Sequence, residues 1–262
     1  MSGRPEFRDW IDRKPEASEG PLPLTHVTKG ITAQDVIRDG AIKATECPVF
    51  KRSLAYLFYG RPAYRVGGDG PIRRASSSPF CFIFSPELIE RAEAVYAFDT
   101  GAYAARMYKH SIMEEMKPAD FALEVSLNQP AKLVECVFGS SENYFDGRPI
   151  GASEEEIAEW EFLAQAYVSL VTSTGRNEPD DRVGSIEAVF SKDIDIAGNL
   201  LAVVVPHTVW DEGEKAPWLS RLSERGVEVL PYHFMPGRTP DYYYAFLETE
   251  VRRFYKAHGH LK

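Results

Sequence analysis

The stretch "SLAYLFYGRPAYRV", residues 53–66, starts as an apolar, aromatic strand and ends as a basic turn. Its strand part covers residues 54–59, the chain turns at Gly60, and Arg61 and Arg65 follow at once. Guanidinium groups are rarely buried without a partner, so a strand built only for the core would not end this way. We interpret the segment as a strand whose terminal turn carries arginines to an anion.

The segments on either side of this stretch predict further strands. Short apolar runs bounded by turn residues are typical of buried strands. The expected strands are residues 24–28, 80–85, 121–127, 133–139, 185–190, 200–206 and 227–232.

Helical patterns occur between these strands without a regular β-α-β alternation. The expected helices are residues 32–39, 86–98, 101–116, 153–173, 216–225 and 240–257. The helix over 153–173 has the strongest pattern, because Ser153 can cap it and its first turn is acidic. The irregular order of the elements predicts an α+β protein.

The first 23 residues contain four prolines among many charges, which predicts an irregular N-terminal arm. Residues 24–262 are then expected to form a single domain, a size that allows a large hydrophobic core. No apolar run reaches the roughly 20 residues of a membrane span, and the three cysteines are too few for a disulfide framework. We therefore expect a reduced, cytoplasmic protein without a membrane partner.

Charge is distributed unevenly along the chain. The net charge is −9, yet the window from Lys43 to Arg74 carries seven basic residues against Glu46 and Asp69. This window is either a solvated basic face or a local site for phosphate groups in an otherwise acidic protein.

Common catalytic signatures are absent from the sequence, including the phosphate-binding loop, the GxSxG elbow and the HExxH helix. A weaker alternative is a metal-dependent nuclease built on "PDD" at 179–181 and Glu187. Such a site needs a lysine two residues after the glutamate, where this chain has Val189. No metal site is therefore expected.

Three separated segments together are similar to the ADP-ribosyltransferase superfamily, and especially to bacterial DNA-targeting ADP-ribosyltransferase toxins of toxin–antitoxin systems. These toxins open with a Thr-His segment followed by a helix and a glycine, here Thr25, His26 and Gly40. An aromatic strand that closes in a proline-containing turn corresponds to residues 56–62, and a Glu-apolar-apolar strand starts at Glu187. The resemblance implies split, twisted antiparallel β-sheets flanked by helices.

The resemblance also implies NAD as the co-substrate and a set of residues that handle it. Glu187 and Tyr59 would be catalytic, with the carboxylate stabilising the cation that develops at the ribose and the tyrosine ring stacking on nicotinamide. The expected NAD-binding residues are Thr25, His26, Arg52, Tyr56, Tyr59, Arg61 and Arg65. The arginines would pair with the pyrophosphate, and His26 with a ribose hydroxyl.

The implied reaction is cleavage of the nicotinamide–ribose bond, with transfer of ADP-ribose or hydrolysis. Arginine-modifying members of the superfamily carry Glu or Gln two residues before the catalytic glutamate, where this chain has Ser185. Protein arginine is therefore a poor candidate for the acceptor. The resemblance implies nucleic acid, DNA or RNA, as the acceptor, and a toxin or phage-defence effector with an antitoxin or regulatory protein as the context. The alternative from another class is a non-enzymatic module that senses a nucleotide or a phosphorylated partner.

Overall fold

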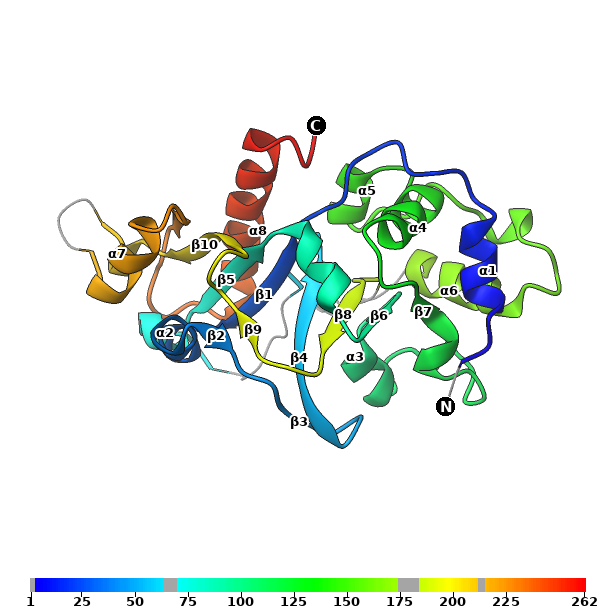
Figure 1. Cartoon of the computed structure of the whole chain (residues 1–262), viewed down its shortest axis with the longest axis horizontal. Coiled ribbons are helices and arrows are strands. Elements are labelled where there is room, and N and C mark those ends of the chain that lie inside the picture. The colour runs from blue at the N-terminus through cyan, green and yellow to red at the C-terminus, as the bar shows by residue number, and fades with distance from the viewer. Residues whose placement is uncertain (1–2, 64–69, 174–183, 212–214) are drawn as a thin grey trace.

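The computed structural model describes residues 3–63, 70–173, 184–211 and 215–262 (Figure 1). These residues form an α+β protein around a large mixed, mostly antiparallel sheet, as the order of the elements predicted. Within these ranges, no helix has both the length and the apolar character that a membrane crossing requires.

The large sheet has nine strands, with β3 paired to β4 beside the main path. The main path runs β11-β10-β5-β1-β4-β8-β6-β7, and only β10 and β11 are parallel. A separate two-stranded ribbon pairs β2 with β9. The strands are β1 (Leu24–Lys29), β2 (Ala41–Ile42), β3 (Thr45–Cys47), β4 (Arg52–Tyr59), β5 (Pro79–Phe84), β6 (Ala94–Tyr96), β7 (Ala122–Leu123), β8 (Glu187–Phe190), β9 (Ile194–Asp195), β10 (Leu200–Pro206) and β11 (Glu228–Tyr232).

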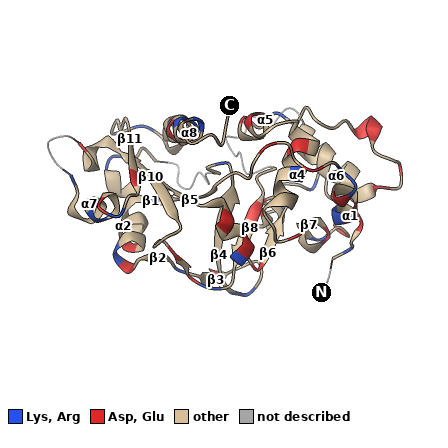
Figure 2. Cartoon of the chain, turned by 45° about the horizontal axis from the view of Figure 1, so that its top comes forward, with Lys and Arg blue, Asp and Glu red and all other residues tan. Residues whose placement is uncertain are grey.

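Apart from α3, the α-helices gather in two groups, one over the β11 end of the sheet and one beyond the β7 end (Figure 1). At the first end, α8 lies on one side of β1, β5 and β10 and α2 on the other (Figure 2). At the second end, α1 packs against α4 and α6. The helices are α1 (Glu6–Asp12), α2 (Gly30–Asp39), α3 (Thr100–Ala104), α4 (Asn128–Phe138), α5 (Ser141–Phe145), α6 (Phe162–Thr172), α7 (Pro217–Ser223) and α8 (Pro240–Ala257).

The middle of the sheet is nearly divided into two halves. Strands β1 and β5 pair over all six residues of β1, whereas β1 and β4 pair only at Leu24–Tyr59 and Thr25–Phe58. Beyond Thr25, β1 continues alongside β5 while β4 continues alongside β8 and β3. The sheet therefore opens between β1 and β4, and the backbone groups there are not used by a β-ladder.

Several sequence predictions are confirmed, among them β1, β5, β10 and α8, while others are wrong. The helix expected over 86–98 is instead a 3₁₀ turn (Pro86–Arg91) followed by strand β6, and residues 133–138 of the expected strand belong to helix α4. The helix expected over 101–116 is only α3 followed by turns, and the one over 153–173 reduces to a 3₁₀ turn and α6. The N-terminal arm is not wholly irregular, because it contains α1, which buries Phe7, Trp10 and Ile11. Apolar content drove these errors, since a short buried helix and a buried strand look alike in sequence.

The turn after β4 explains why the aromatic strand within residues 53–66 is followed directly by an arginine. Gly60 has a φ of +67°, and a Cβ there would lie 2.5 Å from the Leu22 side chain, so only glycine fits. Its N–H donates to the Pro23 carbonyl at 2.8 Å. The chain then bends back at Arg61, whose N–H donates to the Tyr59 carbonyl, and this bend carries Arg61 into the protein rather than to the surface.

Candidate functional site

A pocket of about 280 Å³ lies where β1 and β4 separate. Its walls come from β1, from β3 and the turn after it, from β4, from the first residue of β8 and from the start of α3. Small-molecule sites typically start at about 300 Å³, so the pocket can hold a ring with an attached sugar but not a whole dinucleotide. Of the eight residues predicted to form the site, His26, Tyr56 and Glu187 line it.

Glu187 is the first residue of β8, opposite Phe58 of β4 and Tyr96 of β6. Its side chain is only 3% exposed, and Oε1 accepts a hydrogen bond of 2.7 Å from the Thr100 hydroxyl. Burial and the nearby Asp99 carboxylate raise the pKa of Glu187 well above its usual value, although the bonds from Thr100 act in the opposite direction. The site therefore holds a carboxyl group whose charge depends strongly on what occupies the pocket.

His26 occupies the opening between the two halves of the sheet. Its Nδ1 lies 3.0 Å from the carbonyl oxygen of Tyr56, which β1 does not pair with. Because a carbonyl can only accept, Nδ1 carries the proton, and the other ring nitrogen of the neutral ring is an acceptor. Burial lowers the pKa of His26 despite the opposing bond to the carbonyl, so the neutral form is favoured at neutral pH.

Tyr56 and Cys47 form a polar pair on the wall next to Glu187. The Tyr56 hydroxyl donates to Cys47 Sγ at 2.7 Å, and the N–H groups of Val49 and Phe50 also point to this sulfur, at 3.3 and 3.5 Å. Burial by itself would raise the pKa of the Cys47 thiol, but these donors bring it below its usual value. Burial, together with the bond to the cysteine, raises the pKa of Tyr56. The tyrosine is therefore a fixed, neutral donor to a thiol whose pKa is lowered.

The pocket is acidic. Its lining includes the carboxyl groups of Glu46, Asp99 and Glu187, and no Lys or Arg of the described chain belongs to it. Asp99 also caps α3 by accepting from the Ala102 N–H at 2.8 Å. A cationic group is therefore favoured inside this pocket, and a phosphate is disfavoured.

Tyr59 lies on the other face of β4 and does not line the pocket. Side chains alternate along a strand, so Tyr56 and Phe58 face the pocket while Leu57 and Tyr59 face the core. Tyr59 is 1% exposed, and its hydroxyl accepts from the Leu22 N–H at 2.9 Å. The expected stacking on nicotinamide has no support from this position, which is that of a core residue.

Thr25 and Arg61 are also placed for a structural role. Thr25 is fully buried, and its hydroxyl donates to the Arg61 carbonyl at 2.5 Å. The Arg61 side chain is buried, with Cζ 5.9 Å from the centroid of the Tyr144 ring. Neither residue lines the pocket, so the arginine expected to pair with pyrophosphate is directed into the protein instead.

Two other basic residues of the sequence window, Arg52 and Lys43, each pair with an acidic side chain. Arg52, at the start of β4, forms an ion pair with Glu93, and Lys43 pairs with Asp193 at 2.9 Å. Arg65 lies outside the described residues. Figure 2 shows Lys and Arg interspersed with Asp and Glu over the described chain.

The sequence analysis missed Cys47, Asp99 and Thr100. Cys47 is one of three unpaired cysteines, and neither its spacing nor its neighbours mark it. Asp99-Thr100 is a helix-start signal of the Ser/Thr/Asp type, which could have placed the beginning of α3. Only the fold brings that helix start against β8.

Among the described residues, no group of three or more His, Cys, Asp or Glu side chains could hold a metal ion. Residues 179–181, which carried the nuclease alternative, lie outside the described ranges. The chain matches no protein-family model, and no curated protein or solved structure gives a significant match to it. The chemistry of the site is therefore argued from its geometry.

Proposed function

We propose that this chain is an NAD-consuming enzyme, an ADP-ribosyltransferase or NAD glycohydrolase, that cleaves the nicotinamide–ribose bond. The observation that carries the proposal is the convergence of His26, Tyr56 and Glu187 on one acidic pocket. These residues lie on three separate strands, β1, β4 and β8, and all three belong to the set of residues that the resemblance implies.

The electrostatics of the pocket favour the nicotinamide end of NAD. Nicotinamide in NAD carries a positive charge, and bond cleavage leaves a ribosyl cation. Three carboxyl groups in the lining stabilise both cations, most strongly where water is excluded. The pyrophosphate would lie outside this pocket, because it would meet only negative charge within it.

Glu187 has two tasks in this scheme. When the glycosidic bond breaks, its electron pair moves to the nicotinamide nitrogen, and the Glu187 carboxylate stabilises the ribosyl cation that remains. A water or hydroxyl acceptor then bonds to the anomeric carbon, and its proton passes to Glu187. The raised pKa of Glu187 suits this second task, because a carboxylate of higher pKa is a stronger base.

His26 and Tyr56 would orient the substrate. The acceptor nitrogen of neutral His26 can take a hydrogen bond from a ribose hydroxyl, since Nδ1 is held by the Tyr56 carbonyl. The half-buried Tyr56 ring lines the pocket and offers an electron-rich face to a cationic ring. In this proposal Tyr56 takes the stacking role that the sequence analysis gave to Tyr59.

We also propose that the chain has the ADP-ribosyltransferase fold. The near-division of the sheet between β1 and β4 fits the split, twisted sheets of the ADP-ribosyltransferase fold. The pocket at this division is where such a fold would bind NAD. The proposed acceptor is DNA or RNA, within a toxin or phage-defence system with an antitoxin or regulatory partner, and this part rests on the resemblance alone.

The experiment is to incubate the purified chain with NAD, with and without DNA or RNA, and to measure free nicotinamide and labelled nucleic acid. We expect nicotinamide release, with the label on nucleic acid if the chain is a transferase and free ADP-ribose if it is a glycohydrolase. Glu187→Gln should lower the rate by about 10²–10³-fold. Glu93→Gln, which changes a carboxyl group outside the pocket, is the matched control and should keep the wild-type rate.

The alternative is a binding module that senses a nucleotide without chemistry. Calorimetric heat on NAD addition, with no nicotinamide released under any condition, would favour that alternative. No NAD binding at all would reject both readings of this pocket.

A further inference from the structure

The start of α3 places two buried polar side chains against Glu187. Asp99 and Thr100 are 4% and 1% exposed, and both line the pocket between β1 and β4, hereafter the Glu187 pocket. The Thr100 hydroxyl donates to Oε1 of Glu187 at 2.7 Å, and the Thr100 backbone N–H also favours the charged form of this carboxyl group. The Asp99 carboxylate, one residue earlier, accepts from the Ala102 N–H at 2.8 Å. One turn of chain therefore presents both a donor and a negative charge to Glu187.

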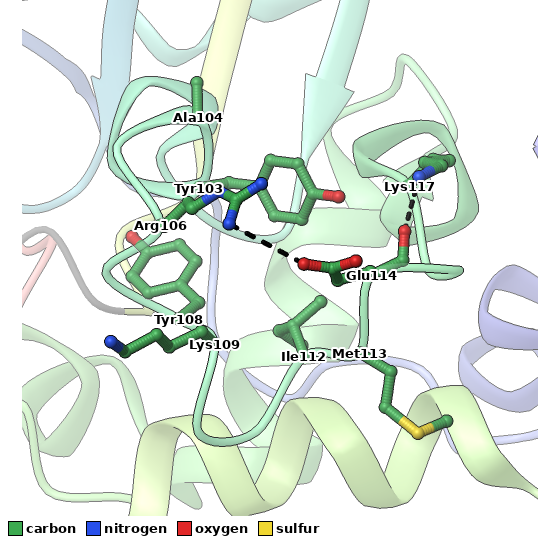
Figure 3. Close-up of a pocket in the computed structure, with 9 residues that line it drawn as sticks. All are labelled: Tyr103, Ala104, Arg106, Tyr108, Lys109, Ile112, Met113, Glu114 and Lys117. Atoms are coloured by element: carbon green, nitrogen blue, oxygen red, sulfur yellow. Dashed lines mark hydrogen bonds and ion pairs between the residues drawn. The ribbon is translucent and has the colours of Figure 1, made fainter.

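This turn is anchored on both sides. Phe98, directly before it, is fully buried and stacks on the Tyr103 ring at a centroid distance of 6.0 Å. Figure 3 shows the Tyr103 side chain pointing from α3 across the hollow that residues 103–117 form. The Tyr103 hydroxyl donates to the Met116 carbonyl at 2.7 Å. The two polar side chains therefore cannot move away from Glu187 unless these contacts break.

Asp99 is the main fixed charge that Glu187 meets in the folded protein. The other ionisable groups that face Glu187 come from each neighbouring element of the described chain: Tyr56 of β4, Tyr96 of β6, His26 of β1, and Glu46 and Cys47 of β3.

These other groups act on Glu187 more weakly than Asp99 does. Burial raises the pKa of both tyrosines and lowers the pKa of the histidine, so all three are neutral at neutral pH. Glu46 is exposed, so water and salt screen its charge. Burial is the largest cause of the raised pKa of Glu187, Asp99 is the next, and Cys47 has a smaller effect.

We propose that Asp99 and Thr100 are positioning residues that act on the Glu187 carboxyl in opposite directions, with Thr100 stabilising and orienting the carboxylate and Asp99 favouring its protonated form. The catalytic consequence rests on the proposed NAD reaction, in which Glu187 acts as a carboxylate. Together the two residues set the lower pH limit of that reaction, because bond cleavage needs the charge on Glu187.

Carbon-13 NMR titration of the glutamate side-chain carboxyls measures Glu187 directly and without NAD, and Glu187→Gln assigns its signal. Asp99→Asn should lower the titration midpoint by at least about half a pH unit, because asparagine can still cap α3 but carries no charge. Thr100→Val should raise the midpoint by a similar amount, because valine keeps the branched shape and lacks the hydroxyl.

Two further variants control for general effects of substitution. Thr100→Ser restores a hydroxyl and should return the midpoint to within about 0.2 pH units of wild type. Asp35→Asn removes a half-exposed carboxylate on α2, outside the Glu187 pocket, and should leave the midpoint within the same limit of about 0.2 pH units.

The pH dependence of nicotinamide release then connects the two residues to the reaction. The acid limb of kcat/KM should move to lower pH in Asp99→Asn and to higher pH in Thr100→Val, whereas a merely structural defect would lower the rate at every pH. Midpoints that move in the same direction, or that do not move, would overturn the inference. Opposite midpoint shifts in a protein that releases no nicotinamide would reject the NAD reaction and keep the assignment of Asp99 and Thr100.

Discussion

The hydroxyl of Thr100 donates to Oε1 of Glu187 across 2.7 Å, and this bond ties the first turn of α3 to the first residue of β8. It is a buried contact between residues 87 positions apart, in a pocket wall that also contains Asp99. A buried carboxyl group with a second carboxylate nearby costs stability whenever it is ionised. The site therefore has an energetic cost that can be measured without knowing the substrate.

Glu187→Gln should stabilise the protein at high pH. The pKa of Glu187 in the folded protein is raised above the 4.5 of an ordinary glutamate, so between these two values the folded state keeps a proton that the unfolded state has lost. Stability then falls as pH rises through this window. We expect the variant to exceed wild type by at least about 1 kcal/mol at pH 8 and to match it at pH 4.

Calorimetric melting at pH 4, 6 and 8 checks this expectation. Glu93→Gln is the control of opposite sign, because the bond from Arg52 lowers the pKa of Glu93 and its replacement should not stabilise the protein at pH 8. A Glu187→Gln variant that melts below wild type at pH 8 would show that the carboxylate is held by favourable contacts instead.

Two tyrosines three residues apart on β4 should respond differently to loss of the hydroxyl. Tyr59→Phe leaves the buried Leu22 N–H without its acceptor and should cost about 1–3 kcal/mol of unfolding free energy. Tyr56→Phe keeps the ring that stacks in the proposal and removes only the bond to Cys47, so it should cost less stability than Tyr59→Phe. Urea unfolding and NAD titration of both variants separate the two roles, and a stable Tyr59→Phe protein with weakened NAD binding would restore Tyr59 to the site.

The contrast between Tyr56 and Tyr59 shows which features of the site could be predicted from the sequence and which could not. The strand itself was predictable from its aromatic run, and so was the alternation of its two faces. Which face meets a pocket depends on how β1 and β4 separate, and that separation follows from pairings with β5 and β8 that no local pattern specifies. His26, Tyr56 and Glu187 therefore line one pocket, whereas Tyr59, predicted for the same site, lies on the core face of β4.

The residues that the sequence missed share one cause. Cys47 and Thr100 are unremarkable in their own segments, and they become functional candidates only because β3 and α3 pack beside β4 and β8. Helix α4 was misread for a related reason, since the apolar run over residues 133–138 is mostly buried and looks like a buried strand in sequence.

Arg61→Lys should reduce stability more than it reduces NAD affinity. The guanidinium is buried near the Tyr144 ring, and a Cβ at Gly147 would lie 3.3 Å from Nη2, so the planar group fits a narrow space. An ammonium group cannot fill that space and would be costly to bury, by about 1–2 kcal/mol. The exposed Arg52 is the matched control, and its change to lysine should cost less than about 0.5 kcal/mol. Thermal melting and NAD titration of both variants test this expectation. An unchanged melting temperature of Arg61→Lys with lost NAD binding would indicate that Arg61 pairs with the pyrophosphate of NAD.

Cys47 should be the most readily alkylated cysteine at neutral pH, although it is only 6% exposed. The hydroxyl of Tyr56 and two backbone N–H groups lower the pKa of its thiol against the effect of burial, whereas burial raises the pKa of Cys81 and Cys136. Because the thiolate is the reactive form, labelling of Cys47 by iodoacetamide should begin at a lower pH than labelling of the more exposed Cys136.

Peptide mass spectrometry across pH 5.5–9 measures this order for each cysteine. Tyr56→Phe removes the strongest donor to Sγ and should shift the labelling curve of Cys47 to higher pH while leaving that of Cys136 unchanged. NAD should slow the labelling of Cys47 if it enters the pocket that this cysteine lines, and should not protect Cys136. Earlier labelling of Cys136, or a Cys47 curve that ignores the Tyr56 substitution, would show that the donors around the sulfur do not hold a thiolate. Protection of neither cysteine, in a protein that still binds NAD, would place the dinucleotide away from the Glu187 pocket.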